Sequence, residues 1–216
     1  MRLQKLARRC ATAAPFLAAL ALLYAVAFRP WHLHRGATLA EVLLPLPGDD
    51  LVPSPRFSYT QAISIQARPD EIWPWLAQIG YGRAGWYSHD WIHRLLGIAG
   101  SLEDDRRSAN RVIPELQDLQ AGDLIELAPG MGLEVVQLEP GRFLLTGSEA
   151  GSWVWTLDPA DGDTTRLIVR FRGTWEPGLA NDLMYGVANE LGSLIMQPKT
   201  LQTIKLRVER AGDGRE

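Results

Sequence analysis

Two histidines stand four residues apart in the segment His89-Asp90-Trp91-Ile92-His93. On a helix this spacing places both imidazoles on one face, where they can share a zinc ion. Zinc proteases carry a glutamate beside the first histidine, whereas this chain has Asp90, whose side chain is one methylene shorter. Catalytic zinc also needs three protein ligands, and the remaining histidines, His32 and His34, lie far upstream. We therefore expect no metal here, and we expect these histidines to add polarity at the mouth of a cavity.

The segment Gly80-Tyr81-Gly82-Arg83-Ala84-Gly85 fits the G-x-G-x-x-G pattern of dinucleotide-binding loops. That pattern binds a pyrophosphate only between a strand and the following helix. Here it follows an expected helix and precedes an aromatic turn, so we interpret it as a glycine-rich helix exit and expect no cofactor. The chain also lacks a G-x-S-x-G elbow and a P-loop, and its single cysteine, Cys10, lies in an apolar segment. No standard catalytic motif is predicted.

The aromatic turn Trp86-Tyr87-Ser88 follows the glycine run, and Asp90 comes shortly after it. Aromatic rings with a few convergent polar groups are typical of ligand pockets, but also of packed cores. Two interpretations therefore stay open. The turn is either a wall or gate of a cavity, with Tyr87 and Asp90 as its polar groups, or it packs against a sheet.

Further aromatic residues are candidates for the same cavity, since the chain contains eight tryptophans. Trp153 and Trp155 share one face of an expected strand, and Phe171 and Trp175 share one face of the next. These rings either fill a core or line a cavity. With residues of the helices that would face them, the candidate ligand-binding set is Trp86, Tyr87, Asp90, Trp91, Trp153, Trp155, Phe171, Trp175, Val187 and Leu191.

The composition is that of an ordinary folded protein of one or two domains, with 216 residues of which 46% are hydrophobic and 22% charged. Four of the 22 basic residues lie before residue 10, so residues 29–216 contain 18 basic and 25 acidic residues, a net charge of −7. An acidic body without a basic stripe is a poor partner for nucleic acid. One cysteine cannot form an internal disulfide, so no disulfide framework holds the fold.

Residues 10–28 contain no charged side chain, and nineteen apolar residues are just enough to span a bilayer as a helix. The preceding basic cluster predicts a cytoplasmic N-terminus and an extracytoplasmic body. Ala25-Val26-Ala27 allows another interpretation, a secretory signal cleaved after Ala27. We favour a retained single-pass membrane anchor because the apolar run is longer than the signal core of about 7–15 residues.

The rest of the chain divides into a proline-rich lead-in at residues 29–57, one domain at 58–210 and a tail at 211–216. The lead-in contains five prolines, and we expect it to lie over the domain to cover Trp31, Leu43, Leu44 and Leu46. The domain should begin with a strand over 59–65 and a helix that starts at Pro69 and stops at Gly80. A second helix over 88–96 should turn its apolar side chains inward, namely Trp91, Ile92, Leu95 and Leu96.

Five further strands are predicted, at residues 124–127, 132–138, 143–146, 152–157 and 166–175. Their alternation indicates an antiparallel sheet with one covered and one wet face, and the wet face carries Arg166, Arg170 and Arg172. The covering element should be a long C-terminal helix, with Pro198 as a kink or interruption. The apolar residues of this helix recur at close to helical spacing and should form its inward face: Leu183, Val187, Leu191, Leu194, Ile195, Leu201, Ile204 and Val208.

Strand, two helices, a run of strands and a long C-terminal helix is the element order of the START-like or SRPBCC superfamily, the polyketide cyclase/dehydrase-like proteins. The chain resembles a bacterial membrane-anchored group of that superfamily over about residues 30–210. The matching motifs are Trp31-His32-Leu33 with Gly36-Ala37-Thr38, Pro45-Leu46-Pro47-Gly48-Asp49-Asp50-Leu51-Val52, Ile72-Trp73-Pro74-Trp75-Leu76-Ala77-Gln78-Ile79-Gly80, and Gly85-Trp86-Tyr87-Ser88 with Asp90. His89, His93 and Pro198 depart from the pattern.

The resemblance implies an α+β helix-grip fold, in which a curved antiparallel sheet wraps around the C-terminal helix and leaves an apolar cavity between them. A shared fold does not fix the chemistry. The leading hypothesis is a membrane-tethered module that binds a small hydrophobic molecule, such as a lipid or a polyketide-like compound. One alternative is a cyclase- or hydrolase-type enzyme that uses Tyr87, His89 and Asp90 as acid–base groups. Another is a structural envelope protein that binds a protein partner.

Overall fold

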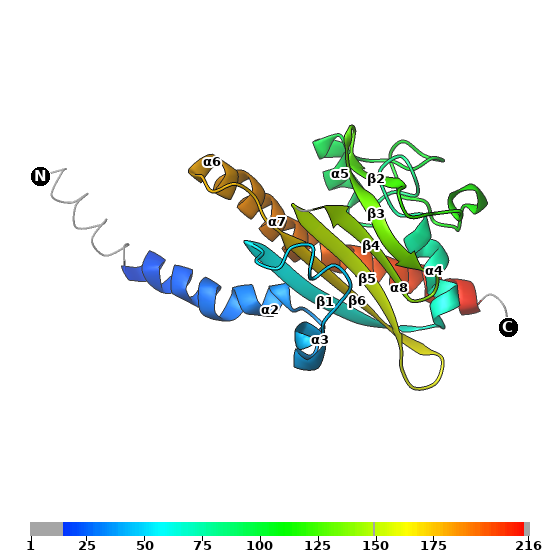
Figure 1. The fold of residues 1–216 in the computed structure, drawn as a ribbon, viewed down its shortest axis with the longest axis horizontal. Helices are drawn as coiled ribbons and strands as arrows, with labels where there is room; N and C mark the ends of the chain where they lie inside the picture. The colour runs from blue at the N-terminus through cyan, green and yellow to red at the C-terminus, as the bar shows by residue number, and fades with distance from the viewer. Residues whose placement is uncertain (1–14, 149, 214–216) are drawn as a thin grey trace, which may run out of the picture.

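The computed structural model describes residues 15–148 and 150–213. Residues 1–14, which include Cys10 and the start of the expected anchor, lie outside the described residues, as do residues 214–216 of the tail. The described chain forms a curved sheet, a long C-terminal helical run against one face of that sheet, and an N-terminal helix that projects from the body (Figure 1).

Six strands form one antiparallel sheet in the order β1-β6-β5-β4-β3-β2. The first strand therefore pairs with the last, and each of the other strands pairs with its neighbour in sequence. The strand and turn signals in the sequence predicted all six strands, and the α+β helix-grip architecture is confirmed. The strands are β1 (Phe57–Gln66), β2 (Leu124–Ala128), β3 (Met131–Glu139), β4 (Phe143–Ser148), β5 (Gly151–Pro159) and β6 (Thr164–Gly173).

Two helices connect β1 to β2, as predicted: α4 (Pro69–Ala77) and α5 (Asp90–Leu96), followed by the 3₁₀ turn η2 (Pro114–Leu116). Glu71 Oε2 accepts the backbone N–H of Arg68 at the start of α4, and Gly97 ends α5 in the left-handed conformation, φ +71°. The predicted inward face of α5 is wrong. Trp91, Leu95 and Leu96 are exposed and His93 is buried instead, because α5 lies at the end of the body and buries only its His93 side.

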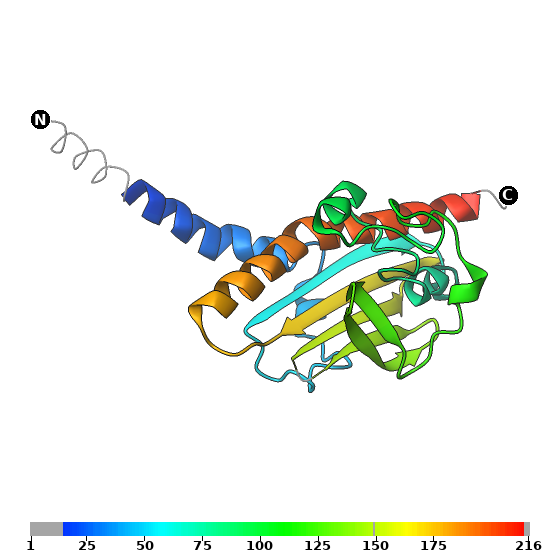
Figure 2. The same ribbon diagram turned by 90° about the horizontal axis from the view of Figure 1, so that it is seen from above.

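The C-terminal helical run is continuous from Leu179 to Asp213 and bends in its middle instead of breaking at Pro198 (Figure 2). It consists of α6 (Leu179–Asn181), the π turn η3 (Asp182–Gly186), α7 (Val187–Leu191), the π turn η4 (Gly192–Met196) and α8 (Gln197–Asp213). Pro198 is the second residue of α8, so its missing N–H falls next to the point where η4 ends and the helical hydrogen-bond pattern changes.

Only the second half of this run packs into the core. Leu201, Ile204 and Val208 are buried, whereas Leu183, Val187 and Leu191 are about half exposed. The predicted inward face is therefore correct for α8 and wrong for α6 to α7. The physical reason is position, because the first half extends beyond the sheet (Figure 2), and its apolar side chains line an open groove beside α5 instead of packing into the core.

The lead-in covers the outer face of the sheet, so the expectation of a wet face is wrong. The helix α3 (Leu39–Leu43) begins at Thr38, which exchanges two hydrogen bonds with Glu41, and Glu41 in turn pairs with Arg166. Arg170 is only 5% exposed. Its guanidinium donates to Thr60 Oγ1, to Asp49 Oδ2 and to three carbonyl oxygens of the lead-in. Leu46 is buried on this face, while Trp31, Leu43 and Leu44 are exposed.

The N-terminal helix spans Pro15–Leu33, including the π turn η1 (Tyr24–Phe28) and α2 (Arg29–Leu33). Its mean hydropathy of 1.5 and its 19 residues make it long and apolar enough to cross a membrane. None of residues 15–28 is buried. Its last turn is fixed to the body, because Arg29 pairs with Glu190 of α7 and His32 Nε2 lies 3.1 Å from the other Glu190 oxygen.

Candidate functional site

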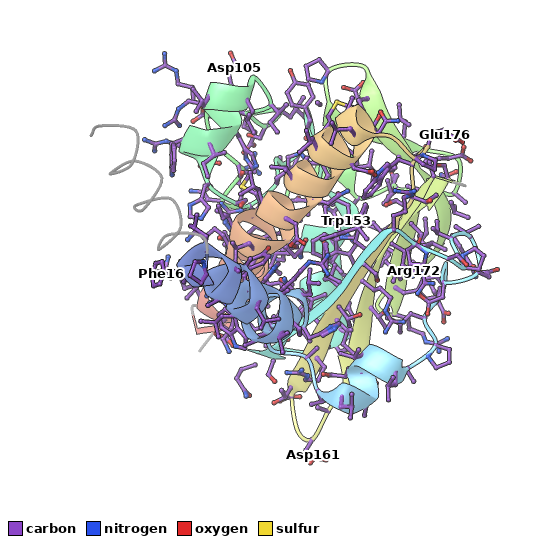
Figure 3. The ribbon with its side chains drawn as sticks, turned by 90° about the vertical axis from the view of Figure 1, so that its left-hand side faces the viewer. Phe16, Asp105, Trp153, Asp161, Arg172 and Glu176 are labelled. Atoms are coloured by element: carbon purple, nitrogen blue, oxygen red, sulfur yellow. The ribbon has the colours of Figure 1, made fainter. Side chains whose placement is uncertain are left out.

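A cavity of about 280 Å³ lies between the concave face of the sheet and the C-terminal helical run. Figure 3 shows Trp153 in the space between these two layers. The walls come from β1, β2, β3, β5, β6, α5 and the segment from α7 to α8. The residues that line it are Tyr59, Trp86, Ser88, His93, Ile98, Leu127, Leu133, Trp153, Phe171, Ala188, Asn189, Gly192, Ser193, Met196, Gln197 and Thr200.

Aromatic rings form the sheet side of this cavity. The Trp86 ring stacks on Trp153 at 5.5 Å between centroids, with an interplanar angle of 17°. Phe171 meets Trp153 edge to face at 6.4 Å and stacks on Tyr59 at 5.8 Å. These rings come from β1, β5, β6 and the aromatic turn, and the register between strands sets their spacing. The result is a rigid apolar wall that suits flat or extended apolar molecules.

A few polar groups interrupt the apolar lining. Tyr59 OH donates to Gln197 Oε1 at 3.0 Å, and burial raises the pKa of Tyr59, which keeps its hydroxyl protonated. Gln197 Nε2 is buried and has no hydrogen-bond partner among the described residues. Burial also lowers the pKa of His93, more than the nearby Asp90 raises it, so a neutral imidazole is favoured at the wall. These groups are uncharged.

A second apolar groove of about 590 Å³ opens beside the cavity, between α5 and the first half of the helical run. It shares four lining residues with the cavity, Ile98, Ala188, Gly192 and Met196. Exposed side chains of α5 and α7 form its sides, among them Leu96 and Leu191. The groove therefore leads from the exposed apolar half of the C-terminal run to the cavity.

The structure brings three of the predicted ligand-binding residues together around the cavity: Trp86, Trp153 and Phe171. Trp155 lies outside the lining in the core beneath Trp153, with ring centroids 5.1 Å apart. Val187 and Leu191 line the adjoining groove instead. Trp91 is exposed on α5.

Trp175 lies just past β6, away from the cavity lining. Its Nε1 donates to Asp182 Oδ1 at 2.8 Å.

The three residues of the enzymatic alternative do not converge on the cavity. Tyr87 is fully buried with φ +54°, and its hydroxyl accepts a hydrogen bond from Gln78 Nε2 at 2.7 Å. Asp90 Oδ1 accepts from the backbone N–H and the hydroxyl of Ser108. His89 precedes the first turn of α5, and its carbonyl accepts two backbone N–H groups. None of the three is among the residues that line the cavity.

The glycine-rich segment forms a tight turn after α4, closed by backbone hydrogen bonds between Gly80 and Gly85. This is the predicted helix exit. The described residues contain no group of three or more His, Cys, Asp or Glu side chains that could hold a metal ion. Of the two spaced histidines, His93 lines the cavity and His89 does not.

Several lining residues were not predicted, most clearly Tyr59, Ser193 and Gln197. His93 was expected at the mouth of the cavity and does line it. Tyr59 could have been found from the alternation of β1, because it lies on the same face as Phe57. Gln197 and Ser193 carry no such signal. Their places depend on the π turn η4, which rotates the helix face between them, and hydropathy does not reveal such a turn.

Comparisons with known proteins give structural similarity only. No family model matches the chain, and no curated protein matches it. Solved structures similar to it include MLL2253 from Mesorhizobium loti, at 16% identity and a TM-score of 0.41, covering 71% of this chain and 98% of that one. The Polyketide_cyc-like protein Cgl2372 from Corynebacterium glutamicum is 15% identical with a TM-score of 0.40, and the match covers 71% of this chain and 93% of that one. The self-sacrificing resistance protein CalC from Micromonospora echinospora is 9% identical with a TM-score of 0.38, and the match covers 71% of this chain and 95% of that one. One of these structural neighbours is described as a Polyketide_cyc-like protein.

Proposed function

We propose that this protein is a membrane-tethered module that binds a small hydrophobic molecule in the cavity between the sheet and the C-terminal run. The observation that supports this most is the lining itself. Four aromatic rings and several aliphatic side chains surround about 280 Å³, and the polar groups among them are uncharged. Apolar walls with a few placed polar groups are what small-molecule sites commonly have.

The size and polarity of the cavity limit the ligand class. A dry cavity of about 150 Å³ can hold benzene, so 280 Å³ suits one or two rings or a short acyl segment. A longer chain would extend into the adjoining groove. The unpartnered Gln197 Nε2 favours a ligand with one hydrogen-bond acceptor, such as a carbonyl or ester, because an unsatisfied buried donor is costly.

The N-terminal helix supports the proposed membrane tether. Residues 15–28 are unburied, charge-free and helical, as a membrane-spanning segment requires. The basic residues before the apolar segment favour a cytoplasmic N-terminus and place the body outside the cytoplasm. Cleavage after Ala27 would instead release the body as a secreted protein.

The bilayer is the ligand source that the geometry favours. The N-terminal helix and the α6–α7 half of the C-terminal run extend away from the sheet toward the same end of the molecule, in both ribbon views (Figures 1 and 2). They are joined near Glu190. With the helix in a membrane, the exposed Leu179, Leu183 and Met184 would approach the bilayer surface, and the groove would connect that surface to the cavity.

A matched pair of glycine substitutions tests the proposal. Gly192 lies on the rim shared by groove and cavity, and a side chain there meets no atom within 4 Å of its Cβ. Gly192→Phe should therefore obstruct the opening without strain. Gly186→Phe is the control, because Gly186 has the same free space on the same run but does not line either opening.

The measurement is native mass spectrometry of the full chain, extracted from membranes in a mild detergent and incubated with short-chain lipid and fatty-acid probes. The unmodified chain and Gly186→Phe should retain a bound apolar molecule, and Gly192→Phe should lose most of it. Equal retention by all three chains would place the ligand elsewhere. An absence of bound molecules in all three would contradict the proposal.

A further inference from the structure

A second cavity lies at the opposite end of the molecule, between α4 and the C-terminal half of α8. In Figure 1 these two elements lie together near the C-terminus, far from α6 and the N-terminal helix. The volume is about 830 Å³, and none of its lining residues belongs to the hydrophobic cavity. We infer that this polar groove binds a small organic anion that carries a phosphate or carboxylate group.

Arg207 is the centre of the groove. Its guanidinium lies 4.6 Å from the centroid of the Tyr87 ring and 5.7 Å from that of Trp75, and such contacts hold a cation against aromatic faces. Nη2 donates to Ser108 O at 3.3 Å. Nη1 is buried and has no hydrogen-bond partner among the described residues. The side chain is therefore fixed in place with a charged donor left over.

A second orphaned polar atom lies one helical turn away. Thr203 Oγ1 is also buried and unpartnered in the described structure, and Thr203 and Arg207 stand at i and i+4 on the same face of α8. Buried polar groups in native proteins nearly always have a partner. A ligand with several hydrogen-bond acceptors, bound in the groove, would supply the missing partners of both groups.

The charge of the groove fits an anion. Five cationic side chains line it, against the two carboxylates of Asp70 and Glu71. Two of the cations have acidic partners, because Arg68 pairs with Asp70 and Arg111 with Glu103. Lys199 and Arg210 have no ion-pair partner among residues 15–148 and 150–213.

Burial lowers the pKa of Arg207, and this effect is larger than the opposite effects of Tyr87 and of the nearby Asp90 carboxylate. Asp90 Oδ1 is occupied by Ser108. The fold thus gathers a local positive excess in a body whose net charge is −7. This patch does not appear as a basic stripe in the sequence, because its members are Arg68, Arg111 and three residues spread along α8.

Apolar side chains complete the groove and indicate an organic anion rather than a bare ion. Pro74, Val112 and Leu206 line it beside the charged residues. A ligand with an anionic head and an apolar body would satisfy Arg207 and Thr203 and cover these surfaces. Phenyl phosphate has that chemistry, whereas inorganic phosphate has only the head and phenol only the body.

The test is isothermal titration calorimetry of the full chain in a nonionic detergent at constant ionic strength, with these three compounds as probes. Phenyl phosphate should bind saturably, inorganic phosphate more weakly, and phenol not at all at this groove. Arg207→Gln and Lys199→Gln should each weaken phenyl phosphate binding about tenfold or more, the scale of losing a hydrogen bond or ion pair to a charged group. Arg142→Gln, an exposed arginine on the β3–β4 turn, is the matched control and should change nothing.

If Arg207→Gln does not fold, Lys199→Gln and Arg210→Gln decide the question, because both side chains are at the surface of α8 and neither makes a hydrogen bond or ion pair within the described chain. The proposal is overturned if phenyl phosphate does not bind saturably. It is also overturned if the groove variants bind as tightly as Arg142→Gln. Loss of this binding would leave the hydrophobic cavity intact, so the two proposals fail separately.

Discussion

Buried polar side chains in this molecule fall into two groups. Arg170 belongs to the first, since its guanidinium has five hydrogen bonds and joins the sheet to the lead-in. Gln197 Nε2 and Arg207 Nη1 belong to the second, because each is buried without a partner. A satisfied group stabilises the fold, whereas an orphaned donor is a cost that a ligand can remove. Gln197 Nε2 and Arg207 Nη1 are the members of the second group that lie at the two candidate sites.

His93 should make stability depend on pH. Burial lowers its pKa in the folded state, while an unfolded histidine takes up a proton near pH 6.5. As the pH falls below about 6.5, the unfolded chain binds more protons than the folded one, so the free energy of unfolding decreases until the folded-state pKa is passed. Above that range the contribution to stability is fully present.

Urea unfolding of the full chain at pH 7.5 and pH 5 measures this effect. His93→Gln should reduce the loss of stability between the two pH values. The part that remains is expected from the buried His32 and the half-buried His34, because desolvation also lowers the pKa of both. His89→Gln, on the turn before the same helix but outside the cavity lining, is the matched control. An equal loss in the unmodified chain and in both variants would contradict the assignment.

At the scale of elements, the lead-in behaves as part of the domain rather than as a linker. Its residues supply Asp49 and three carbonyl groups to Arg170, and Leu46 packs in a small cluster with Ala62, Leu145 and Ile168. The sheet is thus covered on both faces, by the helical run on the concave side and by the lead-in on the outer side.

Arg170→Gln should destabilise the protein strongly. The shorter amide cannot reach all five acceptors and leaves buried carbonyl groups unsatisfied, which we expect to cost about 3 kcal/mol in the free energy of unfolding. Chemical denaturation measures the loss, and limited proteolysis within residues 29–57 should become faster. Arg142→Gln, whose side chain is 70% exposed, should change the free energy by less than about 0.5 kcal/mol. Similar values for the two variants would show that the lead-in is not held by Arg170.

The sequence predicted the positions of the helices and strands better than it predicted which of their faces are buried. Strand-forming segments separated by turn residues predicted all six strands, and Pro69 and Gly97 marked the start of α4 and the end of α5. The prediction that the apolar faces of α5 and of the first half of the C-terminal run are buried was wrong. Leu183, Val187 and Leu191 have the spacing of a core-facing helix, but apolar periodicity does not distinguish a face turned to the core from one turned to a groove or a bilayer.

The candidate site was predictable only in part. Trp153 and Phe171 were found because strand alternation places large aromatic side chains on one face, and Trp86 was found because it stands in the aromatic turn. Gln197 and Arg207 could not be found in this way, since a polar residue on a helix usually faces solvent. Only the packing of the helical run against the sheet and α4 shows that both have buried, unpartnered atoms.

At the scale of the whole molecule, two different ends are connected by the C-terminal run. One end has the N-terminal helix, the exposed apolar half of the run and the groove to the hydrophobic cavity. The other end has the cationic groove around Arg207. The acidic body would be repelled by anionic headgroups, so membrane contact should come from the anchor and the apolar rim rather than from charge.

Replacing residues 1–28 with a cleavable secretion signal should release the body from membranes without unfolding it. None of residues 15–28 is buried, so their removal takes nothing from the core. Fractionation should find the released body in the soluble fraction, with thermal unfolding close to that of the full chain in detergent. Membrane association that persists after a high-salt wash would show that the body itself binds lipid and that the tether is not needed.

Photo-crosslinking in native membranes tests the central claim most directly, because it locates the ligand and its source together. The full chain would be labelled with a lipid that carries a diazirine in its acyl chain, and the modified residues would be mapped by mass spectrometry. We predict crosslinks at the cavity wall, on Met196, Trp153 or Phe171, that Gly192→Phe removes and Gly186→Phe preserves. Crosslinks confined to the N-terminal helix at residues 15–28 would contradict a lipid-binding cavity and leave the protein as an anchored domain with a filled core.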